Sequence, residues 1–166
     1  EIPKRDWSSD VLFRSTPYEG GVRVPAFWRW PGRLEAGTDC KALTAHVDVF
    51  PTLASLAGAD LSLVRRQIEG RSLIPLLEDP RAPWPDRLLV THFGRWESGE
   101  AAAARHRSCA IRNARFKLVN HSELYDLETD PGEGHDVAEL HPDVVAGLRT
   151  AYDAWWGSVL PETEAN

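Results

Sequence analysis

The second half of the chain alternates short runs of β-forming residues with turns, and this pattern limits the possible folds more than any other feature. Runs rich in β-branched and aromatic residues cover 88–93, 109–111 and 116–120, and residues 124–127 lead into the turn-rich sequence Asp130-Pro131-Gly132-Glu133. Strands that are this short and are separated by turns pair with their neighbours in the sequence. The pattern therefore predicts an antiparallel sheet.

A helix should follow the sheet. Pro142 is suited to the first turn of a helix, where its missing N–H costs little. The apolar residues that follow recur at helical spacing and define one face, made by Val144, Val145, Leu148, Tyr152 and Trp155. We expect this face to cover one side of the sheet.

The first half of the chain opens with a different pattern. Tyr18-Glu19-Gly20-Gly21 predicts a sharp turn, because glycine adopts backbone angles that other residues avoid. The residues from 22 to 30 are rich in β-branched and aromatic types and predict a strand, in which Pro25 is tolerated only at an edge or irregular position. Pro31-Gly32 should end this strand in a turn.

A helix is then predicted to begin at Asp48, which is a good N-cap, with Pro51 in its first turn and Gly58 as its C-cap. Its apolar residues predict one buried face: Val49, Phe50, Leu53, Leu56 and Ala57. His46 beside Asp48 is compatible with metal binding or proton transfer. We favour a structural interpretation, in which Asp48 caps the helix and His46 packs or hydrogen-bonds at its start.

The middle of the chain predicts a boundary. Residues 70–77, Gly-Arg-Ser-Leu-Ile-Pro-Leu-Leu, indicate a turn followed by a short apolar helix. The stretch 79–86, which contains proline and tryptophan, indicates a linker. We therefore expect residues 16–80 to form one part of the structure and residues 81–166 to form a subdomain with the antiparallel sheet and the terminal helix.

Charge and composition exclude some partners. The net charge of −6, without a basic tract, argues against nucleic-acid binding. No apolar run approaches the roughly 20 residues that cross a bilayer, so we expect no membrane span. Cys40 and Cys109 lack the spacing of a zinc site, and we expect free thiols, with a disulfide as the alternative. The sequence indicates neither a compartment nor an oligomeric state.

The N-terminal end of the sequence resembles translated adapter DNA. Residues 6–15 can be back-translated to GACTGGAGTTCAGACGTGCTCTTCCGATCT, which resembles a common sequencing adapter with one dinucleotide lost. We therefore interpret residues 1–15 as a non-native segment, to be kept out of the fold prediction. The alternative is a genuine amphipathic segment whose apolar residues are Trp7, Val11, Leu12 and Phe13.

Segments from both halves of the chain, taken in order, resemble the sulfatases. They are the turn at 18–21, the helix start at 46–53, the element at 70–77 and the strands and turn at 109–133, of which the last is the most specific. The resemblance implies an alkaline-phosphatase-like α/β fold. This chain would supply the end of the α/β domain and the C-terminal antiparallel sheet packed by a helix.

The resemblance also implies a chemistry. Sulfatases hydrolyse sulfate esters with a formylglycine nucleophile and a calcium ion, which hard oxygen ligands hold. Neither cysteine lies in the Cys-x-Pro-x-Arg motif from which formylglycine is made. We expect that motif and the calcium ligands to lie upstream of Thr16, so we assign no catalytic and no metal-binding residue in this chain.

The candidate site residues lie in two places. Sulfatases usually carry a sulfate-binding lysine four residues before the tyrosine of the 18–21 turn, and Arg14, inside the adapter-like segment, occupies that position here. A guanidinium could bind a sulfate through two hydrogen bonds. Tyr18 and Glu19 should then lie beside the active site. His92 and Arg95, at the end of a strand, indicate either the rim of a substrate pocket or a surface loop.

The other histidines share no ligand spacing, and we expect surface or capping roles for His106, His121, His135 and His141.

The sequence leads to three hypotheses for the function of the chain. The first is a C-terminal fragment of a sulfatase that acts on an aryl or carbohydrate sulfate, the fragment itself being inactive. The second is a fragment of a sister phosphohydrolase or phosphonate hydrolase. The third is a non-catalytic interaction module.

Overall fold

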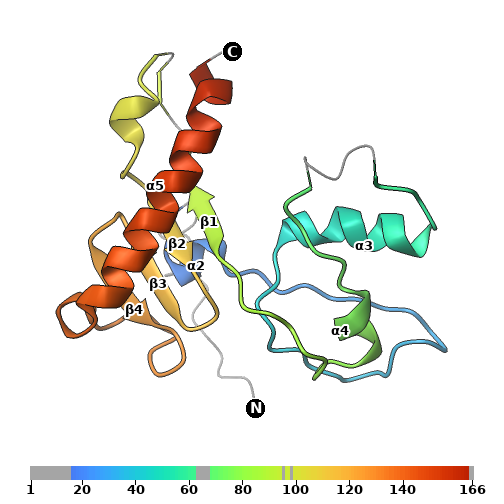
Figure 1. The fold of residues 1–166 in the computed structure, drawn as a ribbon. Helices are drawn as coiled ribbons and strands as arrows, with labels where there is room; N and C mark the ends of the chain where they lie inside the picture. Colours follow the sequence, from blue (N-terminus) through green and yellow to red (C-terminus); the bar gives the residue numbers. More distant parts are fainter. Residues whose placement is uncertain (1–15, 63–67, 95, 98, 165–166) are drawn as a thin grey trace. The chain divides into compact units, whose positions relative to one another are not determined.

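The structure is a computed structural model that describes residues 16–62, 68–94, 96–97 and 99–164, with side chains described up to residue 160. The described residues divide into two compact units, one made of 16–25 with 88–164 and the other of 26–87. Residues 16–25 thus group with the C-terminal sheet (Figure 1). Within the described residues, none of the helices combines the length and the apolar character that a bilayer crossing requires.

The first unit contains the predicted antiparallel sheet. Its four strands are β1 (Leu89–His92), β2 (Cys109–Arg112), β3 (Phe116–Val119) and β4 (Glu123–Asp126), and they lie side by side in chain order. Residues 120–122 connect β3 and β4. Asn120 and His121 have positive φ, and the N–H of Ser122 donates to the carbonyl of Val119, which closes a tight turn of the kind that suits a twisted hairpin. The short strands and turns of the sequence therefore form a simple meander.

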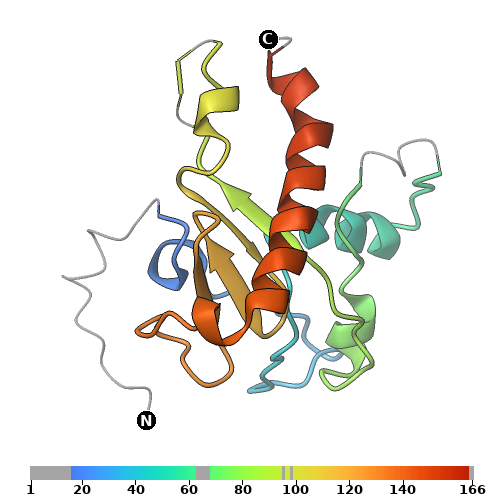
Figure 2. The same ribbon diagram turned by 60° about the vertical axis from the view of Figure 1, so that its left-hand side comes forward.

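Helix α5 (Pro142–Glu164) covers one face of this sheet, as Figure 2 shows. Alternate residues of the strands point toward it, so Ile111, Leu118 and Leu124 form the core with the helix. The helix contributes Val145, Leu148, Tyr152 and Trp156 to this core, while Val144 and Trp155 are only partly buried. The predicted apolar face is correct, and Trp156, which was not part of the prediction, is buried more deeply than Trp155.

The opposite face of the sheet receives the N-terminal turn. The predicted turn begins with Tyr18 in an extended conformation and continues as a single helical turn, α2 (Glu19–Val22), rather than as a glycine turn with positive φ. Tyr18 packs there against Ala110, Val119 and Tyr125. One face of the sheet thus carries α5 and the other carries α2.

The strand predicted for residues 22–30 is wrong. Val22 ends α2, and residues 23–30 have no regular secondary structure in the described chain. A strand needs a partner for its backbone groups, and the four strands of the sheet pair with one another. Pro25 further removes a backbone donor. Phe27 is consequently 91% exposed, and the expected turn at Pro31-Gly32 follows, with Gly32 at φ 79°.

The second unit contains two short helices. They are α3 (Val49–Leu56), which follows a 3₁₀ turn at His46–Asp48, and α4 (Ile74–Glu78). Pro51 lies in the first turn of α3 and Gly58, at φ 69°, follows its end, as predicted. The turn and short helix expected within residues 70–77 also form, with Leu73 and Leu76 buried.

The buried face predicted for α3 is wrong. Val49, Phe50, Leu53 and Leu56 are all exposed, Phe50 by 58% and Leu53 by 52%. The buried residues of this helix are Pro51 and Thr52. Thr52 is buried because its hydroxyl accepts the N–H of Leu73 at 2.8 Å, which orients the other side of the helix toward the 70–78 segment.

Candidate functional site

The candidate turn at residues 18–21 is attached to the sheet by a buried group of charges. The carboxylate of Glu19 lies 3.0 Å from the guanidinium of Arg112 and 2.9 Å from the ammonium of Lys117. Glu133 lies 2.9 Å from the same ammonium, and its second oxygen accepts the backbone N–H of Glu19 at 2.5 Å. Two acids and two bases therefore balance one another where Lys117 is only 1% exposed.

The strand register explains why this group needs Glu19. Arg112 on β2 stands directly opposite Lys117 on β3. Like charges at directly opposed positions of a sheet repel each other, and a buried charge is costly unless it is paired. Glu19 touches both cations, so the turn supplies the charge that the sheet lacks.

Glu133 reaches this group from an unusual backbone conformation. Its φ is 56°, in the left-handed region that residues with a side chain seldom occupy. It closes the turn that begins at Asp130, whose carbonyl accepts the N–H of Glu133. The turn-rich sequence after β4 thus places an acid on the far side of Lys117.

Tyr18 makes a second attachment. Its hydroxyl donates to Glu123 at 2.7 Å, and the hydroxyl of Tyr125 donates to the same carboxylate oxygen at 2.6 Å. Burial, reinforced by the hydrogen bond to Glu123, raises the pKa of Tyr18 to about 12. Tyr18 is therefore a neutral hydrogen-bond donor at physiological pH.

Tyr18 and Glu19 consequently direct their side chains toward the sheet. They hold the turn in place, and the chain that precedes the turn departs from this fixed point. Arg14, the residue at the expected lysine position, lies outside the described residues.

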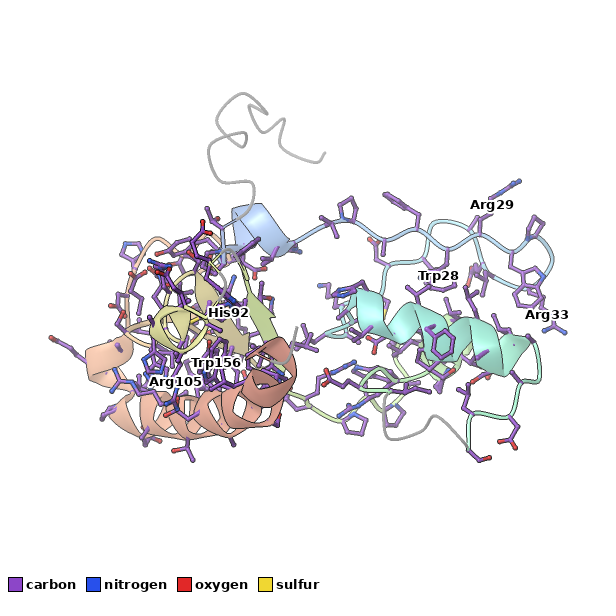
Figure 3. The ribbon with its side chains drawn as sticks, turned by 90° about the horizontal axis from the view of Figure 1, so that it is seen from above. Trp28, Arg29, Arg33, His92, Arg105 and Trp156 are labelled. Atoms are coloured by element: carbon purple, nitrogen blue, oxygen red, sulfur yellow. The ribbon has the colours of Figure 1, made fainter. Side chains whose placement is uncertain are left out.

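His92 lies at the end of β1 within an aromatic cluster. Its ring centroid is 4.8 Å from that of Trp156 and 5.2 Å from that of Trp96, and its Nε2 is 3.2 Å from the carbonyl oxygen of Ala104. Figure 3 shows His92 and Trp156 gathered with Arg105 in this unit. Burial lowers the pKa of His92, so the neutral imidazole is favoured. Arg95, the other predicted residue of this loop, lies outside the described residues.

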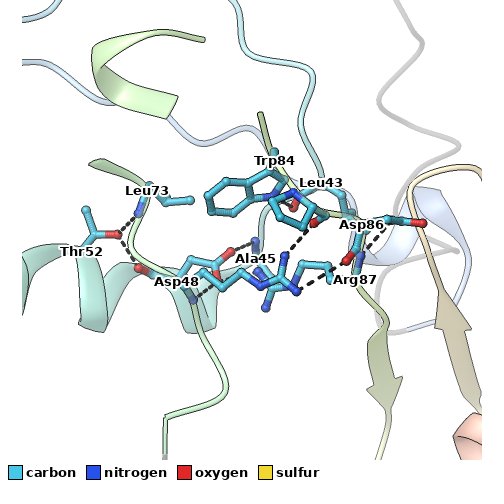
Figure 4. A network of polar contacts seen from close by, with 10 residues as sticks. Leu43, Ala45, Asp48, Thr52, Leu73, Trp84, Asp86 and Arg87 are labelled. Atoms are coloured by element: carbon cyan, nitrogen blue, oxygen red, sulfur yellow. Dashed lines mark hydrogen bonds and ion pairs between the residues drawn. The ribbon is translucent and has the colours of Figure 1, made fainter. Parts of the chain in front are cut away.

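A second buried ion pair organises the other unit (Figure 4). Asp48 occupies the N-cap position of α3, but its carboxylate makes no hydrogen bond to that helix. One oxygen accepts from Arg87 at 2.7 Å and from the N–H of Arg71 at 2.8 Å, and the other accepts from the N–H of Ala45. The predicted capping role is therefore corrected: Asp48 is fully buried and ties three segments together. His46 is exposed.

Three residues come together that no sequence spacing indicates. His106 and His121 stack with ring centroids 3.9 Å apart. Their Nε2 atoms lie 3.3 Å and 3.4 Å from the same oxygen of Asp153 on α5. Sequence reasoning missed this group because its members lie in a loop, a hairpin turn and a helix.

The described residues do not fit the calcium and formylglycine that the resemblance implies. Cys109 is buried and Cys40 is exposed, both are free thiols, and neither belongs to a formylglycine motif. In the part of the chain that the structure describes, the one group of three candidate metal ligands is His106, His121 and Asp153. Two of its three donors are nitrogen atoms, whereas calcium prefers oxygen.

Comparison with known proteins identifies the family. A family model described as N-sulphoglucosamine sulphohydrolase, C-terminal, matches residues 13–150. The chain therefore belongs to the sulfatase family, and its match lies with the C-terminal region of that family. The sulfatase membership that the sequence motifs indicated is confirmed.

Individual proteins that are similar to this chain are also sulfatases. Mouse (Mus musculus) steryl-sulfatase is 53% identical over 178 aligned residues, which cover 91% of this chain and 28% of that protein. Human (Homo sapiens) arylsulfatase A is 33% identical over 162 residues, which cover 82% of this chain and 31% of that protein. The chain thus spans less than a third of the length of these relatives.

Solved structures give the same fold. The crystal structure of Ps i-CgsB has a TM-score of 0.66 and 25% identity, over 84% of this chain and 30% of that one. A protein solved in complex with its substrate D-glucosamine-2-N,6-O-disulfate has a TM-score of 0.57 and 24% identity, over 78% of this chain and 27% of that one. The α/β fold class with a C-terminal antiparallel sheet packed by a helix is confirmed.

Proposed function

We propose that this chain works as the C-terminal part of a longer sulfatase that hydrolyses an aryl or carbohydrate sulfate ester. The observation that carries this proposal is the family match across residues 13–150. The steryl-sulfatase and arylsulfatase relatives support sulfate esters as the substrate class. Formylglycine and calcium belong to this proposal as features of the longer protein, held by residues outside this chain.

The contribution of the chain is to position the turn at residues 18–21. Glu19 and Tyr18 bind the sheet through Lys117 and Glu123, so this turn has a fixed location and orientation on the sheet. A group that precedes Tyr18 in the chain would then reach a substrate from a rigid base. Tyr18 and Glu19 are positioning residues in this proposal, and His92 supports the loop that follows β1.

The test is an assay of the longest protein that contains this sequence, with an aryl sulfate, an aryl phosphate and an aryl phosphonate at equal concentrations in the presence of calcium. We expect the sulfate to be hydrolysed fastest. Faster hydrolysis of the phosphonate or the phosphate would assign the chain to a sister hydrolase instead. Absence of all three activities in a folded protein would support a non-catalytic module.

A second measurement tests the positioning role. Glu19→Gln in the longer protein should lower kcat for the sulfate ester about 10-fold or more, because small displacements of a catalytic group have large effects on rate. Arg81→Gln is the matched control, since Arg81 pairs only loosely with Asp79 on the surface, at 3.9 Å. Equal kcat values in both variants would contradict the role of Glu19.

A further inference from the structure

We propose that His106, His121 and Asp153 form a binding site for one divalent transition-metal ion, of which Zn²⁺ is the best match. This site is separate from the calcium chemistry of the family. It depends on residues of this chain alone and does not require the proposed hydrolase activity.

The distances fit such an ion. Zinc binds nitrogen and carboxylate oxygen at about 2.0–2.2 Å, so adjacent ligand atoms of a tetrahedral site lie about 3.3–3.5 Å apart. The two histidine Nε2 atoms lie 3.3 Å and 3.4 Å from Asp153 Oδ1, and ligand atoms of all three residues fall within 4.8 Å of one another. Two of the three donor spacings therefore already match a tetrahedral ion.

The donor types select the class of metal. Imidazole nitrogen suits zinc, copper, iron and nickel, whereas calcium and magnesium prefer oxygen. Two histidines and one carboxylate leave a fourth position for water, an arrangement known from zinc and iron sites. The ligands must be neutral imidazoles.

The fold supports the three ligands from separate elements. His106 follows the 3₁₀ turn at Ala102–Ala104, His121 sits in the β3–β4 turn at φ 65°, and Asp153 belongs to α5. The backbone carbonyl of His121 accepts a hydrogen bond from Nε of Arg149 at 2.8 Å, which fixes that turn to the helix. An ion at this place would crosslink the helix, the turn and the loop.

One cation competes for the site. The guanidinium of Arg105 lies 2.6 Å from the same oxygen of Asp153. Its side chain is 39% exposed, so it can turn toward solvent when an ion binds. Arg105 should therefore weaken metal binding without preventing it.

The test uses the longest protein that contains this sequence, tag-free and kept in excess Ca²⁺, titrated with Zn²⁺ by calorimetry and with Co²⁺ by visible absorption, which distinguishes tetrahedral from octahedral coordination. We expect one ion per chain and a tetrahedral Co²⁺ spectrum. His106→Gln, His121→Asn and Asp153→Asn should each weaken binding by at least about 10-fold. Asparagine is chosen at position 121 because it tolerates positive φ.

His135→Gln is the matched control. His135 also lies 3.3 Å from an aspartate, Asp130, but in a pair rather than in a group of three. Its loss should leave binding unchanged. Arg105→Gln is a second variant, and it should tighten metal binding about 2- to 5-fold, the effect of removing a half-exposed ion pair. Because misfolding can only weaken binding, a gain in affinity cannot be explained by misfolding.

The proposal is overturned if the wild-type chain binds no stoichiometric ion or gives only an octahedral Co²⁺ spectrum. It is also overturned if the three ligand variants bind as tightly as the wild type, or if Arg105→Gln binds no more tightly than the wild type.

Discussion

Lys117 is the residue on which the attachment of the N-terminal turn depends most. It is fully buried between Glu19 and Glu133. Lys117→Met would leave two carboxylates close together without their shared cation, and breaking a buried pair in this way costs about 3–5 kcal/mol. We expect that loss in the free energy of unfolding, measured by urea denaturation.

Two comparisons sharpen this prediction. Glu19→Gln should cost less, because Lys117 keeps Glu133 as its partner. Arg81→Met should change nothing measurable, since that side chain is 93% exposed. If Lys117→Met were no more destabilising than Arg81→Met, the buried network would not hold the turn.

His92 should make stability depend on pH. Burial lowers its pKa below the ordinary value of 6.5, so between the two values the unfolded chain binds more protons than the folded chain. The stability contributed by neutral His92 is complete above about pH 6.5 and is lost as the pH falls through the lower folded value. His121 acts in the same direction.

His92→Phe keeps an aromatic ring against Trp156 and cannot take a proton. We therefore expect a smaller fall in melting temperature between about pH 7.5 and pH 5.5 than in the wild type. His135→Gln, at a side chain that is 88% exposed, should retain the wild-type fall. Identical pH profiles for the wild type and His92→Phe would rule out this account.

For single residues, the sequence identified structurally important positions correctly, but it assigned them the wrong interactions. Asp48 stood out as a helix cap, yet its carboxylate binds Arg87, 39 residues further along the chain. Glu19 stood out as part of a turn, yet its partners are 93 and 98 residues away. Local patterns report capping and turns, whereas a buried ion pair depends on tertiary contacts that no spacing encodes.

At the scale of elements, the β3–β4 hairpin and α5 were predictable because their patterns are strong and their partners are close in sequence. The strand expected at residues 22–30 failed because β-forming residues make a strand only when another strand pairs with them. The same limit applies to α3, whose periodicity indicates an apolar face but does not supply a covering element. Sequence periodicity thus predicts faces, and only the fold determines burial.

Gly70 is the residue that allows α3 and the 70–78 segment to pack. A Cβ at this position would lie 1.9 Å from the carbonyl oxygen of Val47, a backbone atom that cannot easily move. Gly70→Ala should therefore break the hydrogen bond from the N–H of Arg71 to Asp48 and destabilise this unit by about 1–3 kcal/mol. Hydrogen exchange of the 46–56 backbone should become faster.

Gly147 gives the opposite expectation. It lies inside α5, and a methyl group added there would meet nothing within 4 Å, so Gly147→Ala should stabilise the helix by about 0.5–1 kcal/mol. Thermal unfolding followed by circular dichroism measures this gain. Equal exchange rates at 46–56 in Gly70→Ala and Gly147→Ala would contradict the packing role of Gly70.

At the scale of the whole molecule, most of the large apolar side chains that are exposed among the described residues belong to the unit of residues 26–87. They include Phe27 at 91%, Phe50 at 58% and Leu53 at 52%. Clustered exposure of large apolar side chains marks a surface for interaction or a tendency to aggregate. This agrees with the proposed place of the chain in a longer sulfatase, and it leads us to expect that the 166 residues alone do not hydrolyse an aryl sulfate with calcium above a heat-treated control.

The exposed face of α3 should therefore dominate the solution behaviour of the isolated chain. We expect strong binding of a hydrophobic fluorescent dye and aggregation that increases with concentration. Phe50→Ser with Leu53→Gln should lower both, because these side chains are exposed and the buried contacts of Thr52 remain in place. Leu140→Gln, at a side chain 74% exposed in the other unit, is the control. If the wild-type chain stayed monomeric without binding the dye, or if Leu140→Gln had the same effect as the double variant, the apolar face of α3 would not be the cause.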